Sequence, residues 1–278
     1  METTDTTPVT IIEPKKGWIP VDFKEIWNYR ELLYFLTKRD IKVRYKQTVL
    51  GGLWAIIQPF FTMIIFTFFF GRLAQMPSDG MPYPIFVYSA LLPWTYFSNA
   101  VSTSGNSLVG SANLISKIYF PRLIVPVSAA MGGLLDFFIA MFILAGLIIH
   151  YQVILGFGIL LFPILVLLTF LCAVGVGLWL SALNVQYRDI RYVIPFLIQI
   201  WMFVSPVIYP TSLAKGKYIW FLLINPMSGV IKAYRACIMN HQPIDWGFLG
   251  ISTALILFIF FSGLFYFRRM ERVFADVV

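Results

Sequence analysis

The chain has 278 residues, of which 59% are hydrophobic and 12% are charged. An ordinary soluble domain holds about 45–50% apolar and about 25% charged residues, so this composition excludes a water-soluble globular protein. A helical membrane crossing needs about 20 apolar residues, and the length therefore allows several crossings without a separate soluble domain. The composition predicts an all-α integral membrane protein.

The N-terminal part of the chain divides into two segments. Residues 1–24 are rich in Thr and Pro, show no cleavable signal peptide, and are predicted to form a loosely ordered cytoplasmic tail. Residues 25–46 instead show helical periodicity, with one apolar and one basic face. The apolar positions are Ile26, Tyr29, Leu33 and Leu36, and the basic positions are Lys38, Lys42 and Lys46. This pattern predicts an amphipathic helix at the membrane surface, with a solvated basic helix as the alternative.

Six apolar stretches follow, each bounded by polar, Pro or Gly positions, and they predict six transmembrane helices. They cover residues of about 50–71, 84–104, 123–148, 156–183, 192–210 and 247–267.

The net charge of +8 is unevenly distributed, so it indicates membrane topology and no nucleic-acid partner is expected. With six crossings, sixteen of the 21 lysines and arginines fall on the side of the N-terminus and five on the opposite side. Because cytoplasmic loops carry the excess of positive charge, both termini are predicted to be cytoplasmic.

The stretch 211–246 is apolar enough to enter a membrane, but Asn225-Pro226 interrupts it. A full crossing here would place Arg268 and Arg269 outside, against the charge rule. A re-entrant pair of short helices at the outer mouth of a pathway fits better, because irregular backbone at membrane depth is tolerated only inside protein or beside water. A plain amphipathic lid is the alternative.

The residues offer no gathered catalytic chemistry. His150 and His241 fall in different loops, no histidine and cysteine cluster has metal-ligand spacing, and no GxxxxGK[ST] phosphate loop occurs. Cys172 and Cys237 lie in different segments and are predicted to be small core residues. No enzymatic activity, metal or cofactor is therefore expected on this chain.

Asp136 is the one charged residue within a predicted crossing. An ionisable group in a membrane span is a functional candidate, here for a proton- or sodium-coupled carrier. No basic residue is expected at matching depth, so the favoured interpretation is structural, with the carboxyl group either neutral or bonded to backbone or hydroxyl groups at a helix contact.

Two short cytoplasmic connections are candidate contact points for a partner that supplies energy. Residues 105–122 contain a predicted helix from Ser107 to about Tyr119, and residues 184–191 form a turn. Plain connecting loops are the alternative.

Six stretches, taken together, resemble the membrane subunit of ABC-2 type polysaccharide exporters, which move O-antigen, capsule or teichoic-acid chains on a lipid carrier. They are KRDIKVRYKQTVLGGLWAIIQP (38–59), LLPWTYFSNAV (91–101), NLISKIYFPR (113–122), LNVQYRDIRYVIPF (183–196), SPVIYP (205–210) and NPM (225–227). The resemblance covers about residues 27–272.

The resemblance implies a homodimer bound to two copies of a cytoplasmic ATPase, which would bind ATP and Mg²⁺. It also implies an interface helix before the first crossing, a coupling helix after the second and outer gate helices before the sixth. It assigns ATPase coupling to Ser111, Asn113, Leu114, Ile115, Lys117, Tyr187, Arg188 and Asp189. It assigns the lipid diphosphate to Lys42, Arg44 and Lys46, where anionic membrane lipid is an alternative partner, and the outer gate to Asn225, Pro226, Lys232 and Arg235.

A sugar polymer has apolar C–H faces on which aromatic rings can stack without fixing its register. The candidate channel aromatics are Trp54, Phe60, Tyr88, Trp94, Tyr96, Phe97, Trp201 and Tyr209, each of which can alternatively face lipid or pack in the bundle.

The sequence thus predicts one transmembrane domain at 25–272 and a cytoplasmic C-terminus at 273–278, in a bacterial cytoplasmic membrane. The predicted function is ATP-driven export of a lipid-linked polysaccharide. The alternatives are an ABC-2 permease for a smaller amphiphile, such as a drug or lipid, and a membrane-embedded transferase acting on lipid-linked sugars.

Overall fold

The computed structural model describes residues 23–46, 51–214, 216–239, 243–271 and 274. Every regular element among these residues is helical, which confirms the all-α prediction. Nearly all of the predicted tail at 1–24 and C-terminal segment at 273–278 lies outside the described residues.

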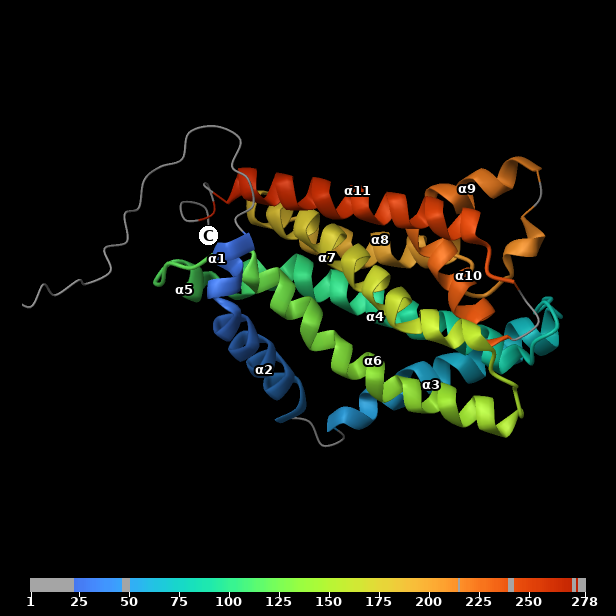
Figure 1. Ribbon diagram of the computed structural model, residues 1–278. Coiled ribbons are helices and arrows are strands. Elements are labelled where there is room, and N and C mark those ends of the chain that lie inside the picture. The colour runs from blue at the N-terminus through green and yellow to red at the C-terminus, as the bar shows by residue number, and fades with distance from the viewer. Residues whose placement is uncertain (1–22, 47–50, 215, 240–242, 272–273, 275–278) are drawn as a thin grey trace, which may run out of the picture.

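Four long helices run side by side through the molecule (Figure 1). They are α4 (Tyr83–Gly110), α6 (Ile124–His150), α7 (Phe162–Gln186) and α11 (Trp246–Met270). The helix α4 is the most central, because it contacts α6, α7, α3, α8 and α10 and buries most of its residues. Two less covered helices flank this bundle, α3 (Trp54–Phe66) and α8 (Ile190–Val204).

The remaining elements are short or lie at the ends of the bundle. The N-terminal helices are α1 (Phe23–Asn28) and α2 (Arg30–Lys46), and α5 (Ala112–Ile115) follows α4. The hairpin between α8 and α11 contains α9 (Ile219–Ile224) and α10 (Pro226–Ile238). The short helical turns are η1 (Gly51–Leu53), η2 (Thr67–Leu73, π-helical), η3 (Phe157–Leu161), η4 (Thr211–Leu213) and η5 (Gly216–Tyr218).

Four helical stretches of the described chain are long and apolar enough to cross a membrane, which supports a multi-pass membrane protein. They are Gly51–Leu73, Ile124–His150, Phe157–Gln186 and Trp246–Met270, and they match four of the predicted crossings. The helix α4 has the length for a crossing but is more polar, and α8 has 15 residues.

Two predicted boundaries are wrong. The helix expected from Ser107 to Tyr119 is broken, because α4 continues to Gly110, the chain bends at Ser111, and α5 spans only Ala112–Ile115. Glycine weakens a helix, which explains the end of α4. The stretch expected to cross at 192–210 loses its helix after Val204, since Pro206 disfavours helical backbone at the residue before it.

The helices α7 and α11 approach each other closely at two glycines. A Cβ atom built on Gly263 would lie 2.5 Å from the carbonyl oxygen of Gly175, and one on Gly175 would lie 2.7 Å from the Cα of Phe260. Small residues at such crossings let helix backbones pack directly, which is a main source of helix association in membranes.

We predict that Gly263→Leu lowers the melting temperature of the purified protein by several degrees, because overpacking a close helix contact costs about 1–3 kcal/mol. The measurement is thermal unfolding in detergent. The matched control is Gly146→Leu on α6, where an added Cβ meets no atom within 4 Å. Equal melting temperatures for the two variants would contradict the proposed helix contact.

Candidate functional site

An ion pair joins α2 to the middle of α6. The Arg44 guanidinium donates from Nη1 to Oδ2 of Asp136, and the hydroxyl of Tyr45 donates to Oδ1 of the same carboxylate. Both carboxylate oxygens therefore have a partner, which offsets the cost of a charge within an apolar helix.

The expectation that no basic residue reaches the depth of Asp136 is wrong. Arg44 lies outside the predicted crossings, on the helix α2 that precedes the first of them. The helix α2 packs against α6, with Asp40 and Ile41 beside Gly132, and this contact carries Arg44 to the carboxylate. A hydrogen-bonded hydroxyl group was expected, and Tyr45 provides it.

The predicted two faces of α2 are present in the structure. Leu36 is buried. Ile26 on α1, Tyr29 between α1 and α2, and Leu33 on α2 pack against the core. Lys38, Lys42 and Lys46 are exposed. Of the three residues assigned to a lipid diphosphate, Lys42 and Lys46 are thus open to a ligand, whereas Arg44 is held by Asp136.

The eight predicted channel aromatics fall into two groups. Trp54 and Phe60 on α3 are 53% and 39% exposed, while Trp201 on α8 and Tyr209 after it are partly exposed. The other four side chains are buried on α4 and pack inside the bundle. They are Tyr88, Trp94, Tyr96 and Phe97.

The hydroxyl groups of the two buried tyrosines bond to the backbone of α6. Tyr88 donates to the carbonyl of Ala140 at 2.8 Å, and Tyr96 donates to the carbonyl of Ala130 at 3.2 Å. The phenol groups therefore need no bound ligand to satisfy them, because buried polar groups require only one such partner.

The two candidate cytoplasmic contact points lie at the same end of the bundle as α1 and the last turn of α11 (Figure 1). Asn184 near the end of α7 links them, since its Nδ2 donates to the carbonyl of Gly105 at 2.9 Å and to Oδ1 of Asn106 at 3.1 Å. The ends of α4 and α7 are therefore held together.

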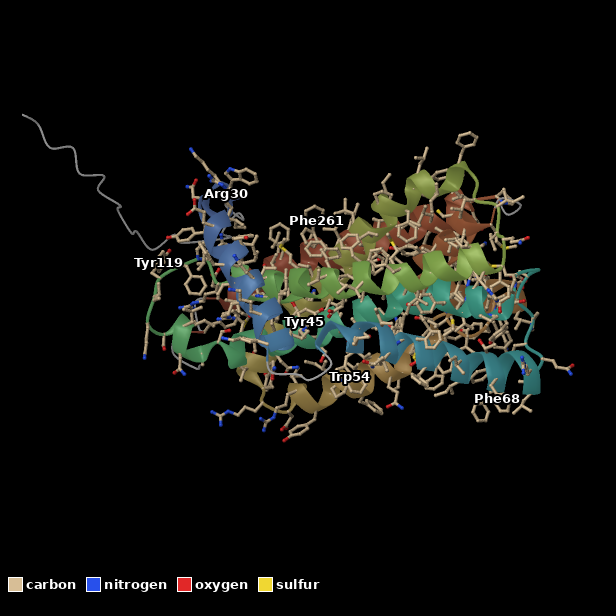
Figure 2. All side chains as sticks on the ribbon, turned by 90° about the horizontal axis from the view of Figure 1, so that it is seen from below. Arg30, Tyr45, Trp54, Phe68, Tyr119 and Phe261 are labelled. Carbon is tan, nitrogen blue, oxygen red and sulfur yellow. The ribbon has the colours of Figure 1, made fainter. Side chains whose placement is uncertain are left out.

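Most side chains assigned to coupling reach solvent from this end. Exposed members are Asn113, Lys117, Tyr187, Arg188 and Asp189; Ser111 and Leu114 are half-buried, and Ile115 is buried. Ile118 and Tyr119, which follow α5, are 59% and 69% exposed, and Tyr119 stands out from this end in Figure 2. Exposed apolar side chains beside charged ones are typical of a protein contact surface.

The start of α6 is bound to the end of α11. The backbone N–H of Arg122 donates to Oε1 of Glu271 at 3.0 Å, and the Arg122 guanidinium donates to the Glu271 carbonyl. Arg268 adds an ion pair of 2.9 Å to Glu271. Through these bonds, the segment that follows α5 is fixed to the last helix.

The hairpin at the opposite end breaks at Asn225, as predicted. Asn225 begins α10 by accepting from the N–H of Met227, and Pro226 occupies the first helical position. The Asn225 carboxamide also accepts from the Trp201 indole at 2.9 Å and donates to the Ser205 hydroxyl at 2.8 Å. One side chain thereby joins the end of α8 to the start of α10.

The helix α10 is an internal element of the bundle. Every residue of α10 except Lys232 is buried, whereas α9 buries only Leu222. Buried Arg235 donates to the carbonyls of Phe86 (3.2 Å), Val207 (2.8 Å) and Tyr209 (3.4 Å), and its guanidinium lies 3.6 Å from the centre of the Phe86 ring. It thus ties the hairpin to the chain after α8 and to α4.

An ion pair closes the hairpin against the last helix. The Lys232 ammonium lies 2.7 Å from Oδ2 of Asp245, which also caps α11 by accepting from the Phe248 N–H. The hydrogen bonds from Lys232 and from the Phe248 backbone lower the pKa of Asp245 from its usual value.

Comparison with known proteins identifies the family. The model of the ABC-2 type transporter family matches residues 31–239, which cover α2 from Glu31, the segment after α4 and the hairpin of α9 and α10. The chain belongs to the ABC-2 type transporter family. The resemblance inferred from the six sequence stretches is confirmed.

Several ABC-2 relatives match over most of their length. An O-antigen export system permease protein, RfbA, of Myxococcus xanthus is 27% identical over 257 residues, covering 92% of this chain and 98% of the relative. Another RfbA, of Klebsiella pneumoniae, is 26% identical over 89% of this chain and 95% of the relative. The polysialic acid transport protein KpsM of Escherichia coli is 26% identical over 84% and 91%.

Four positioning residues of this ABC-2 protein were missed in the sequence. Tyr45 and Ser205 carry no local signal, since their partners come from other helices. Asp245 directly precedes the apolar run of α11, which is the pattern of a helix N-cap. Glu271 stands three residues after Arg268, the spacing of a helical ion pair.

We predict that Arg235→Lys destabilises the folded protein by about 1–3 kcal/mol, because a lysine ammonium cannot reach three carbonyl groups and leaves buried acceptors unpaired. Thermal unfolding in detergent measures this change. The control is Lys232→Met, which removes a partly exposed cation on the same helix and is expected to cost less than about 1 kcal/mol. A larger loss in the control would contradict the assignment.

The ion pair at Asp245 predicts a pH dependence. Because its pKa in the folded protein lies below the unfolded value of about 3.9, Asp245 stabilises the fold above about pH 4, and this contribution disappears as the pH falls further. Asp245→Asn should therefore flatten the fall in melting temperature between pH 5 and pH 3, an interval about this unfolded value. Asp189→Asn, exposed at the other end, is the control. An unchanged slope in Asp245→Asn would refute the effect.

Proposed function

We propose that this chain is the membrane permease subunit of an ABC exporter that carries a polysaccharide across the cytoplasmic membrane of a bacterium. The observation that carries the proposal is the match along nearly the whole chain to permeases named for O-antigen export and polysialic acid transport. Two polysaccharide-related names among the relatives favour a glycan cargo over a drug or a free lipid.

The proposed topology has six crossings, formed by α3, α4, α6, α7, α8 and α11, with both termini cytoplasmic. It is supported by the basic residues at the end that carries α5, since cytoplasmic segments hold the excess of lysine and arginine. In this arrangement, α2 is the cytoplasmic interface helix, and α9 and α10 are re-entrant gate helices at the outer end.

The energy source in this proposal is a separate ATPase, present in two copies, which holds ATP and Mg²⁺. Its contact surface is α5 with the exposed residues up to Tyr119 and the turn at 187–189. The exposure of this surface supports the assignment, as does the bond of Asn184 that keeps both parts together. Force applied at α5 would reach α6 directly and α11 through Arg122 and Glu271.

The proposed assembly is a homodimer with the polysaccharide path between the protomers. The helices α3 and α8 are the least covered of the bundle, since α8 buries only Ile194 and α3 buries only Pro59 and Met63. Exposed aromatic rings on these two helices, including Trp54, would line the path and slide along the sugar faces. Phe68 at the far end of this surface points away from the bundle in Figure 2.

The lipid carrier of the polysaccharide would meet the basic face of α2. Lys42 and Lys46 are exposed and suit a diphosphate group, since ammonium groups pair well with phosphate. Arg44 would join them only after leaving Asp136, so the two lysines carry this part of the proposal.

Replacing Asn113, Leu114 and Lys117 together with glycine tests the coupling. We expect export to fall at least about tenfold, equal to about 1.4 kcal/mol of lost coupling, while the complex keeps hydrolysing ATP. Surface polysaccharide on whole cells and phosphate release by the purified complex measure the two activities. The control is Lys217→Gly, an exposed residue at the outer end. Normal export in the triple variant would refute the coupling surface.

Cells that lack the chain test the function as a whole. They should accumulate lipid-linked polysaccharide on the cytoplasmic side and lose it from the surface, and the wild-type chain should restore it. Unchanged surface polysaccharide would overturn the proposed cargo.

A further inference from the structure

A cavity of about 380 Å³ lies within the protomer, between the end of α2, the start of α3, and the facing sides of α4 and α6. Tyr45 and Trp54, which belong to its lining, are labelled where α2 meets α3 in Figure 2. Its volume falls within the range of small-molecule sites, about 300–1,000 Å³. It adjoins the exposed surface of α3 that is proposed above as part of the polymer path, and Trp54 belongs to both.

Carboxamide and aliphatic hydroxyl side chains from α3 and α4 line this cavity. On α4 they recur on one helical face, at Thr95, Asn99, Ser102 and Thr103. Gln58 on α3 faces the same space. The side chains of Gln58 and Asn99 are both exposed, and within the described residues neither carboxamide is bonded to another protein group, so both are open to a ligand. Polar groups at membrane depth face water or a ligand in preference to lipid.

The only charges in the lining cancel each other. Arg44 and Asp136 both belong to it, and their ion pair, with the Tyr45 hydroxyl, uses both carboxylate oxygens. A phosphate group entering here would meet a guanidinium that is already engaged and a neighbouring carboxylate that repels it. A lipid tail would leave the carboxamides unpaired. The lining therefore suits a neutral, hydroxyl-bearing group.

The remaining wall is apolar and partly aromatic, with Leu92, Pro59, Tyr96 and Phe137. A pyranose ring presents hydroxyl groups at its edge and C–H groups on its faces. Carboxamides donate and accept hydrogen bonds together, which matches adjacent sugar hydroxyls, and aromatic walls match the C–H faces.

We propose that this cavity is a binding subsite for one uncharged sugar ring. The subsite rests on the proposed glycan cargo and extends it, since it places a sugar inside each protomer. Gln58 and Asn99 bind the hydroxyl groups, and the ion pair of Arg44 with Asp136 holds α2 in place as one wall. The ring can come from the transported glycan or from a membrane glycolipid.

Photolabelling of the full chain in nanodiscs tests the subsite. The probe is octyl β-D-glucoside with a diazirine on the sugar, and the matched control probe is octyl phosphocholine with a diazirine on its headgroup. We expect the sugar probe to label residues 54–59 and 95–103 at least fivefold more than the control probe does, as mapped by mass spectrometry. Asn99→Leu and Gln58→Leu should each reduce this labelling at least fivefold. Ser98→Ala, on α4 but outside the lining, should leave it unchanged.

The outcomes separate the alternatives. Competition by methyl glucoside would assign the site to a glycan ring, and competition only by octyl glucoside would assign it to a glycolipid; both support the subsite. Equal labelling by the two probes, or full labelling of variants that keep the wild-type melting temperature, would overturn it. If labelling is absent while export is normal, the subsite fails and the proposed function stands. If labelling is present but cells without the chain export normally, the subsite stands and the proposed function fails.

Discussion

The ion pair between Arg44 and Asp136 joins the N-terminal helix α2 to the bundle. A carboxylate in the middle of the apolar helix α6 is costly without a partner, and removing one member of such a pair usually costs more than the pair itself contributes. The pair therefore binds α2 to α6 and places the start of α3 opposite α4. The ion pair and the packing of α2 on α6 together place the exposed lysines of α2 and form one wall of the cavity beside Asp136.

A second group of polar contacts organises the end of the bundle that carries α9 and α10. The helix α8 ends after Val204, and Arg235 binds the carbonyl groups of Val207 and Tyr209 in the irregular chain that follows. Asn225 binds the end of α8 through Trp201 and Ser205. The hairpin is therefore held by bonds to backbone and side chains from α4 and α8, and its position is linked to theirs.

Much of the fold could be predicted because apolar runs of membrane length are a local signal. Four helices of membrane length and the break at Asn225 were predicted from composition and charge alone. The partner of Asp136 could not be predicted, since Arg44 is 92 residues away and the contact depends on how α2 packs on α6. The burial of Tyr88 and Phe97 was missed for the same reason: periodicity shows a helix, but not which face lies inside the bundle.

The distribution of close contacts distinguishes four tightly packed helices from two that are less covered. The helices α4, α6, α7 and α11 interlock, and α7 meets α11 at glycine. In contrast, α8 buries one residue, while α3 contains Pro59 and ends in the π-helical segment Thr67–Leu73. Proline and π-helical turns interrupt the regular hydrogen bonding of a helix. Shifting α3 and α8 relative to the other four would therefore break fewer buried contacts than any rearrangement within the four. The polar cavity lies between α3 and the packed helices α4 and α6, so a movement of α3 would change its volume. A sugar ring bound in the cavity would therefore favour the position of α3 in which the cavity fits the ring.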